Sequence, residues 1–233
     1  MKITKELLKE KGACAAGYRD FLKEYPVDKY PDGVEYQELL NCCAEKNFSY
    51  GSWLLGAFGK TDEIRKIDGD LIVEKGIIFA GWLEVKGCIK AGWGIEAGDG
   101  IEAGLGIEAG DGIKTGGDIE AGCGINAGCG MKAGGGIEAG LGIEAGDGIE
   151  AGGGIKAGNG IKACYGIKAR YGIKAGWGIE AGDGIEVDDE FGIYAGLCCR
   201  ITNKTQRKII AKKRPENIMC GEFEEKSDSE GKA

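Results

Sequence analysis

The residues best suited to chemistry in this 233-residue chain are its ten cysteines, because the chain contains no histidine. Thiolates bind zinc and carry out redox reactions, but cysteine-based zinc sites need closely spaced pairs such as Cys-x-x-Cys. No such pair occurs, and instead Cys42-Cys43 and Cys198-Cys199 are adjacent. Free cysteine packs well as a small apolar residue. We therefore predict reduced thiols, with the two adjacent pairs buried as small apolar residues, and no metal and no cofactor.

Aspartates that recur beside glycine, such as Asp99, Asp111 and Asp147, suggest a second chemistry, which is calcium binding. Calcium-binding repeat turns use a nine-residue Gly-Gly-x-Gly-x-Asp spacing that is absent here, and aspartate favours turns in any case. The sequence offers no nucleophile beside a base, so an active site has nothing from which to be built. We predict turns and no enzymatic activity.

Basic residues lie among aromatic ones late in the repeat region, beside Tyr165, Tyr171 and Trp177. This combination is suited to phosphate contacts and base stacking. The net charge of −8 opposes binding to nucleic acid, so docking of an acidic protein is the preferred interpretation. The opposite reading, in which rows of glutamate at 96, 102, 108 and at 138, 144, 150 imitate nucleic acid, is weakened by the intermixed lysines. The basic patch is predicted to consist of Lys156, Lys162, Lys168, Arg170 and Lys174.

These side chains are positioned by a six-residue repeat. From Leu71 to Ile185 every sixth residue is Leu, Ile or Met, and a small or β-branched residue usually follows two places later. A charged residue between them gives the alternation of a β-strand, with Ile and Ala inward and Glu or Lys outward. Gly-x-Gly then suits a tight corner in which positive φ angles are expected. The chain is therefore predicted to be mainly β, folded as a parallel β-solenoid.

Each coil of the solenoid is predicted to hold two hexads, which gives a 12-residue coil, although an 18-residue coil is the alternative. The common left-handed hexapeptide helix has three hexads per coil, but its small residue follows the aliphatic one by four places rather than two. The residue between the glycines alternates between polar and apolar, and a period of 12 collects the apolar ones on one edge. Aligned exposed apolar residues favour an interface. The candidate interface consists of Trp93, Leu105, Leu141, Tyr165 and Trp177, with Cys129 on the same edge.

Four segments are predicted. Residues 1–66 form a small helical domain, since Thr4 is a suitable N-cap, Gly12 a suitable stop, and Pro26 ends a second amphipathic stretch. Residues 67–190 form the solenoid. Residues 191–220 form a C-terminal capping segment, and 221–233 form an acidic disordered tail. Caps are expected at both ends because open strands invite pairing with other chains.

The helical segment resembles a module that precedes repeat domains in uncharacterised phage and prophage proteins. The resemblance rests on the Gly-Ala-Cys turn, the Phe-Leu pair and Trp53-Leu54-Leu55, and the hexads that follow strengthen it. It implies a phage or prophage source and no catalytic residues.

We predict a non-enzymatic, protein-binding solenoid that blocks a host protein, such as a defence or nucleic-acid enzyme. A self-assembling structural protein is one alternative, and nucleic-acid binding or mimicry is another. The partner is expected to be a protein, with a homodimer also considered. The sequence has no secretory signal and no apolar run of bilayer length, which predicts a cytoplasmic protein without membrane contact.

Overall fold

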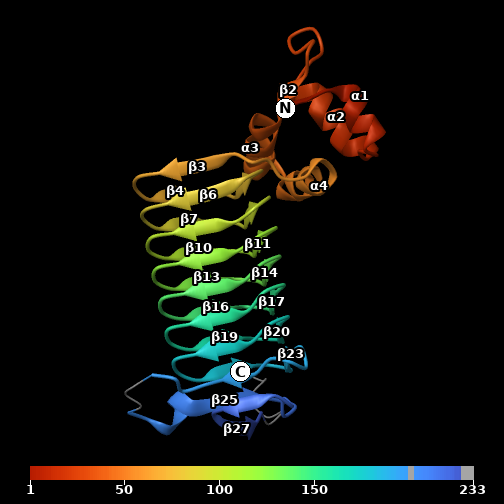
Figure 1. Cartoon of the computed structure of the whole chain (residues 1–233). Helices are drawn as coiled ribbons and strands as arrows, with labels where there is room; N and C mark the ends of the chain where they lie inside the picture. Colours follow the sequence, from red (N-terminus) through yellow and green to blue (C-terminus); the bar gives the residue numbers. More distant parts are fainter. Residues whose placement is uncertain (199–201, 227–233) are drawn as a thin grey trace, which may run out of the picture.

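The computed structural model describes residues 1–198 and 202–226, and it has a helical module at one end of a long β-solenoid (Figure 1). Thr4 caps the first helix, where its hydroxyl accepts the Leu7 amide at 3.3 Å, and the Cys14 thiol caps the second. The module contains α1 (Lys5–Glu10), α2 (Ala15–Glu24), α3 (Tyr36–Lys46), α4 (Phe48–Phe58) and the antiparallel pair β1 (Lys2–Ile3) and β2 (Val34–Glu35).

The solenoid has three sheets rather than two, because each regular strand pairs in parallel with the third strand before it and the third strand after it. The predicted 12-residue coil is therefore wrong, and about nine coils of three hexads each are present.

Sheet I contains β3 (Ile64–Ile67), β6 (Trp82–Val85), β9 (Ile101–Ala103), β12 (Ile119–Ala121), β15 (Ile137–Ala139), β18 (Ile155–Ala157), β21 (Ile173–Ala175), β24 (Ile193–Tyr194) and β26 (Ile218–Cys220). Sheet II contains β4 (Leu71–Val73), β7 (Ile89–Ala91), β10 (Ile107–Ala109), β13 (Ile125–Ala127), β16 (Ile143–Ala145), β19 (Ile161–Ala163), β22 (Ile179–Ala181), β25 (Lys208–Ala211) and β27 (Glu222–Glu225). Sheet III contains β5 (Ile77–Phe79), β8 (Ile95–Ala97), β11 (Ile113–Thr115), β14 (Met131–Ala133), β17 (Ile149–Ala151), β20 (Ile167–Ala169) and β23 (Ile185–Val187).

The predicted inward and outward positions within each hexad are confirmed. In β16, Ile143 and Ala145 are buried while Glu144 between them is exposed, and nearly every regular strand repeats this pattern. Identical residues stack in register, as Ile125, Ile143 and Ile161 do on sheet II. The core is therefore a set of aliphatic columns whose burial provides the main stabilisation.

Glycines are needed at the corners for close packing between coils. Among the described residues none of the hexad glycines has a positive φ angle, so that part of the prediction is wrong. Instead, a Cβ at Gly140 would overlap the carbonyl oxygen of Gly122 in the preceding coil. A Cβ at Gly142 would lie 3.5 Å from the Gly160 carbonyl oxygen, which is an ordinary contact. The two glycines of one corner therefore have different roles.

This difference gives a matched pair of substitutions. Gly140→Ala is expected to lower the free energy of unfolding by about 1–3 kcal/mol, because the new methyl group overpacks the stack. Gly142→Ala should be neutral or stabilise by up to about 0.5 kcal/mol, since alanine restricts the unfolded chain. Urea titrations of both variants measure the effects, and equal shifts would contradict the assigned roles.

The helical module covers the first strand of sheet III. The Gln37 side chain in α3 donates to the Ile78 carbonyl at 2.8 Å and accepts the Ala80 amide at 3.0 Å, as a neighbouring strand would. Ile78 and Ala80 consequently belong to the core of the module. The solenoid strands begin with Ile64, so the helical domain ends earlier than the predicted residue 66.

The C-terminal segment extends the solenoid by further irregular strands. β25 pairs with β22, and β27 pairs with β25, while β26 pairs with β24. Ile209 is fully buried in the main core. Glu222–Glu225 form a paired strand although we predicted disorder from residue 221 onward, and residues 227–233 of that predicted tail lie outside the described residues.

Candidate functional site

The five residues of the predicted apolar interface do not form one edge. With three hexads per coil, Leu105, Leu141 and Trp177 lie on the corner between sheets I and II. Trp93 and Tyr165 lie on the corner between sheets II and III, where Asp111, Cys129 and Asp147 separate them. The predicted edge is therefore wrong, because neighbouring coils bring together residues three hexads apart and not two hexads apart.

Part of the set nevertheless forms a continuous ridge on the corner between sheets I and II. Leu105, Leu141 and Trp177 are 47%, 48% and 39% exposed. Backbone hydrogen bonds of 2.9–3.2 Å join the consecutive coils at this corner. The described strands of the C-terminal segment continue sheets I and II, and Gly196 donates to the Trp177 carbonyl at 2.8 Å, while the side chains of Leu105, Leu141 and Trp177 stay exposed. We define the corner ridge as Leu105, Cys123, Leu141, Asn159 and Trp177.

The predicted basic patch is also dispersed. Lys156 and Lys174 lie on sheet I, Lys162 on sheet II and Lys168 on sheet III, while Arg170 lies on the corner after β20. Four of the five have acidic partners: Lys156–Glu138 at 2.5 Å, Lys162–Glu144 at 3.9 Å, Lys168–Glu186 at 3.3 Å and Arg170–Asp188 at 4.0 Å. These residues therefore do not combine into one basic surface.

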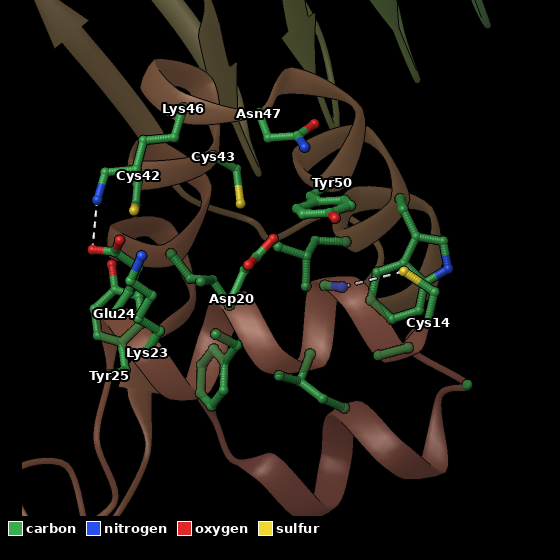
Figure 2. A pocket seen from close by; sticks show the side chains of 18 residues that line it. Cys14, Asp20, Lys23, Glu24, Tyr25, Cys42, Cys43, Lys46, Asn47 and Tyr50 are labelled. Atoms are coloured by element: carbon green, nitrogen blue, oxygen red, sulfur yellow. Dashed lines mark hydrogen bonds and ion pairs between the residues drawn. The ribbon is translucent and has the colours of Figure 1, made fainter.

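A cavity that the sequence analysis missed lies inside the helical module (Figure 2). It has a volume of about 330 Å³, and α1 and α2 form one wall while α3 and α4 form the other. Concave, mainly apolar cavities of this size are the usual form of binding sites. The apolar part of the wall contains Leu8, Ala13, Phe21, Leu39, Leu54 and Trp53.

Polar groups are placed around this apolar pocket. The Lys46 ammonium donates to the Glu24 carboxylate at 2.5 Å at one side, and this bond and charge lower the pKa of Glu24. Figure 2 shows Asp20, Cys43 and Tyr50 projecting toward the space between the walls. They supply a small number of polar contacts to an otherwise apolar pocket.

Cys43, which lines the pocket, is a protonated thiol. Burial, with a smaller effect of Cys42, raises the pKa of the Cys43 thiol to about 12. Burial and a hydrogen bond with Cys42 also raise the pKa of the Tyr25 hydroxyl. Nine cysteines of the described chain are unpaired, and Cys199 lies outside the described residues. Of the adjacent pairs that we predicted to be buried, Cys43 is buried, whereas Cys42 and Cys198 are partly exposed.

A buried carboxylate marks the contact between the module and sheet III. Glu96 occupies an outward position of β8 but is only 3% exposed, because the helices cover it. It accepts hydrogen bonds from the Ser52 hydroxyl of α4 and from Lys114, whose ammonium lies 2.6 Å away. Glu96 is therefore a structural contact and is not available as a surface charge.

Comparison of the chain with known protein families, curated proteins and solved structures finds no match. The resemblance to phage proteins stays a prediction. Within residues 1–198 and 202–226, no three acidic or cysteine side chains are grouped as metal ligands. In the same ranges no helix has the length and apolar character needed to cross a bilayer.

Proposed function

We propose that this is a non-enzymatic interaction protein whose apolar pocket holds an apolar segment of a partner protein. The solenoid then acts as a rigid rod that blocks access to the partner. The target that fits the predicted phage source is a cytoplasmic host protein, such as a defence or nucleic-acid enzyme. The observation that carries this proposal is the open, mainly apolar cavity of about 330 Å³ between the helices.

A peptide segment fits this pocket better than an isolated small molecule, because apolar surface continues beyond it. Trp53, which lines the pocket, is 37% exposed. Tyr25 at another side contacts Tyr30 edge to face, with ring centroids 5.2 Å apart, and Tyr30 is also 37% exposed. Exposed aromatic residues around a pocket are typical of protein interfaces.

The nucleic-acid alternatives have less support. Lysines on the solenoid faces mostly lie beside glutamates, so few basic groups are available for phosphate contacts. The glutamates that were considered as a nucleic-acid mimic are spread over the three sheets. Glu138 lies on sheet I, Glu144 on sheet II and Glu150 on sheet III. Neither the predicted glutamate rows nor the predicted basic patch forms a continuous track.

The experiment is affinity capture from a bacterial lysate with Ala13→Trp, which fills the pocket. Proteins that bind through the pocket should be retained by the unchanged chain and lost by this variant. Ala16→Trp is the matched control, because Ala16 is exposed on α2 and does not line the pocket. A purified candidate should lose at least about tenfold in affinity for Ala13→Trp alone. Equal binding to all three proteins would contradict the proposal.

A further inference from the structure

Sheets II and III carry outward charges that neutralise one another. Each regular strand contributes one outward side chain, and residues in neighbouring strands lie about 4.8 Å apart. On these two sheets every charged outward residue of β7–β23 forms an ion pair within the described chain. The pairs are Lys90–Glu108, Glu144–Lys162 and Glu180–Lys226 on sheet II, and Glu96–Lys114, Lys132–Glu150 and Lys168–Glu186 on sheet III.

Sheet I is different because its outward charges are segregated by sign. Four glutamates stand in consecutive strands, with Lys66 of β3 before them and two lysines after them. Lys66 pairs with Glu84 at 2.5 Å and Lys156 pairs with Glu138 at 2.5 Å. Glu102 and Glu120 form no ion pair or hydrogen bond within the described chain, and Lys174 has only the Tyr194 ring, 5.7 Å from its ammonium. We define the charge column as Glu84, Glu102, Glu120, Glu138, Lys156 and Lys174, in register from β6 to β21.

Neighbouring carboxylates repel one another in the acidic half of the column. Glu120 lies in register between Glu102 and Glu138, and Asp118 precedes it on the same strand edge. Burial raises the pKa of Glu120, and Asp118, Glu102 and Glu138 raise it further. Like charges opposite one another destabilise a sheet unless a counter-charge approaches.

We propose that sheet I binds the sheet I of a second copy of this chain, face to face and antiparallel. A two-fold axis between Glu138 and Lys156 sets each of these residues against the other in the second copy. The same axis sets Glu120 of one copy against Lys174 of the other. A parallel arrangement would instead place Glu120 on Glu120. Glu102 then faces Tyr194 of the other copy. Glu120 and Glu138 thus meet lysines only in the reversed arrangement, which is the symmetry of an isologous interface.

The rest of the molecule is compatible with this arrangement. The helical module packs on β5 of sheet III and leaves the outward residues from Glu102 to Lys174 exposed. β15 and β18 are the fifth and sixth strands of sheet I counted from β3. An axis between them places β6 of one copy opposite β26, the last strand of sheet I, in the other copy. The helical module precedes β3, so it lies beyond the end of the other copy's sheet I and does not collide with it. The corner ridge borders sheet I and would lie beside its own copy, which adds apolar contact.

The test is sedimentation velocity of the full chain with charge-reversed variants. The unchanged chain should form dimers at about 50 mM salt and dissociate as salt screens the contacts. Glu120→Lys and Lys174→Glu should each weaken self-association by at least about tenfold, because each creates like-charge contacts. Mixing the two variants should restore a dimer, since the lysines of one then face the glutamates of the other.

Controls make the outcome specific to sheet I. Glu108→Lys reverses a charge on sheet II and should leave the dimer unchanged, and thermal unfolding checks that all variants fold. A monomer at low salt, a dimer insensitive to Glu120→Lys, or no dimer on mixing would each overturn the proposal. The pocket substitution Ala13→Trp should not affect this equilibrium, so failure here is separate from failure of the proposed function.

Discussion

Replacing Ile143 with aspartate is expected to abolish cooperative unfolding of the solenoid or to lower its free energy of unfolding by more than about 4 kcal/mol. Ile143 is 1% exposed and stacks between Ile125 and Ile161. A carboxylate at this position has no cation or donor in the column to compensate its burial. Circular dichroism during urea titration measures the loss.

The control for this substitution is its neighbour. Glu144→Gln removes an exposed charge whose partner Lys162 is 3.9 Å away, and weak exposed pairs contribute little. We expect a change of less than about 1 kcal/mol. Comparable losses for Ile143→Asp and Glu144→Gln would contradict the assignment of inward and outward positions.

Replacing Lys114 with alanine is expected to lower the free energy of unfolding by about 3 kcal/mol, because it leaves the buried Glu96 carboxylate without its cation. Glu96 is covered by the helices, and only the Ser52 hydroxyl would remain as a partner. The loss should appear first as release of the helical module from sheet III. Hydrogen exchange of the α4 amides measures that release directly.

Lys132→Ala is the matched control, since Lys132 lies in the next strand of the same sheet. Its partner Glu150 is 54% exposed, so water can replace the lost ammonium. The expected cost is below about 1 kcal/mol. Adding Glu96→Gln to Lys114→Ala should recover part of the stability. If Lys132→Ala costs as much as Lys114→Ala, burial of Glu96 is not the cause.

The repeat alone was sufficient to predict the strands and the core, because each hexad contains its own alternation. Ile143, Glu144 and Ala145 face the same directions whether a coil holds two hexads or three. The helical module was equally predictable from local signals such as Thr4, whose capping bond is present. Local patterns determine local structure, and these predictions needed nothing more.

The coil length needed information that no single hexad contains. The alternation between polar and apolar corner residues suggested two hexads, but these residues lie outside the core, so core packing does not constrain their order. Trp93 therefore stacks with Asp111 on one corner, while Leu105 stacks with Cys123 on another. Both the apolar edge and the basic patch were wrong for this reason, since they depended on which coils are neighbours.

The pocket was not predictable because its walls come from separate helices. Phe21 of α2 and Leu54 of α4 are buried as amphipathic patterns suggest, but the space between them depends on how the helices pack. Similarly, the segregation of charge on sheet I becomes visible only at the 18-residue register. Glu120 and Lys174 belong to one column for that reason alone.

The most direct test of this account is disulfide formation that reports the coil length, on which every shared face depends. Leu105→Cys places a thiol next to Cys123 in an 18-residue coil, where neighbouring corners are about 4.8 Å apart and within the span of a disulfide. Gly117→Cys is the comparison, because residues 117 and 129 would be neighbours only in a 12-residue coil. After mild oxidation, peptide mass spectrometry should find the bond to Cys123 in the first variant and no bond to Cys129 in the second. The reverse result would contradict the three-sided solenoid.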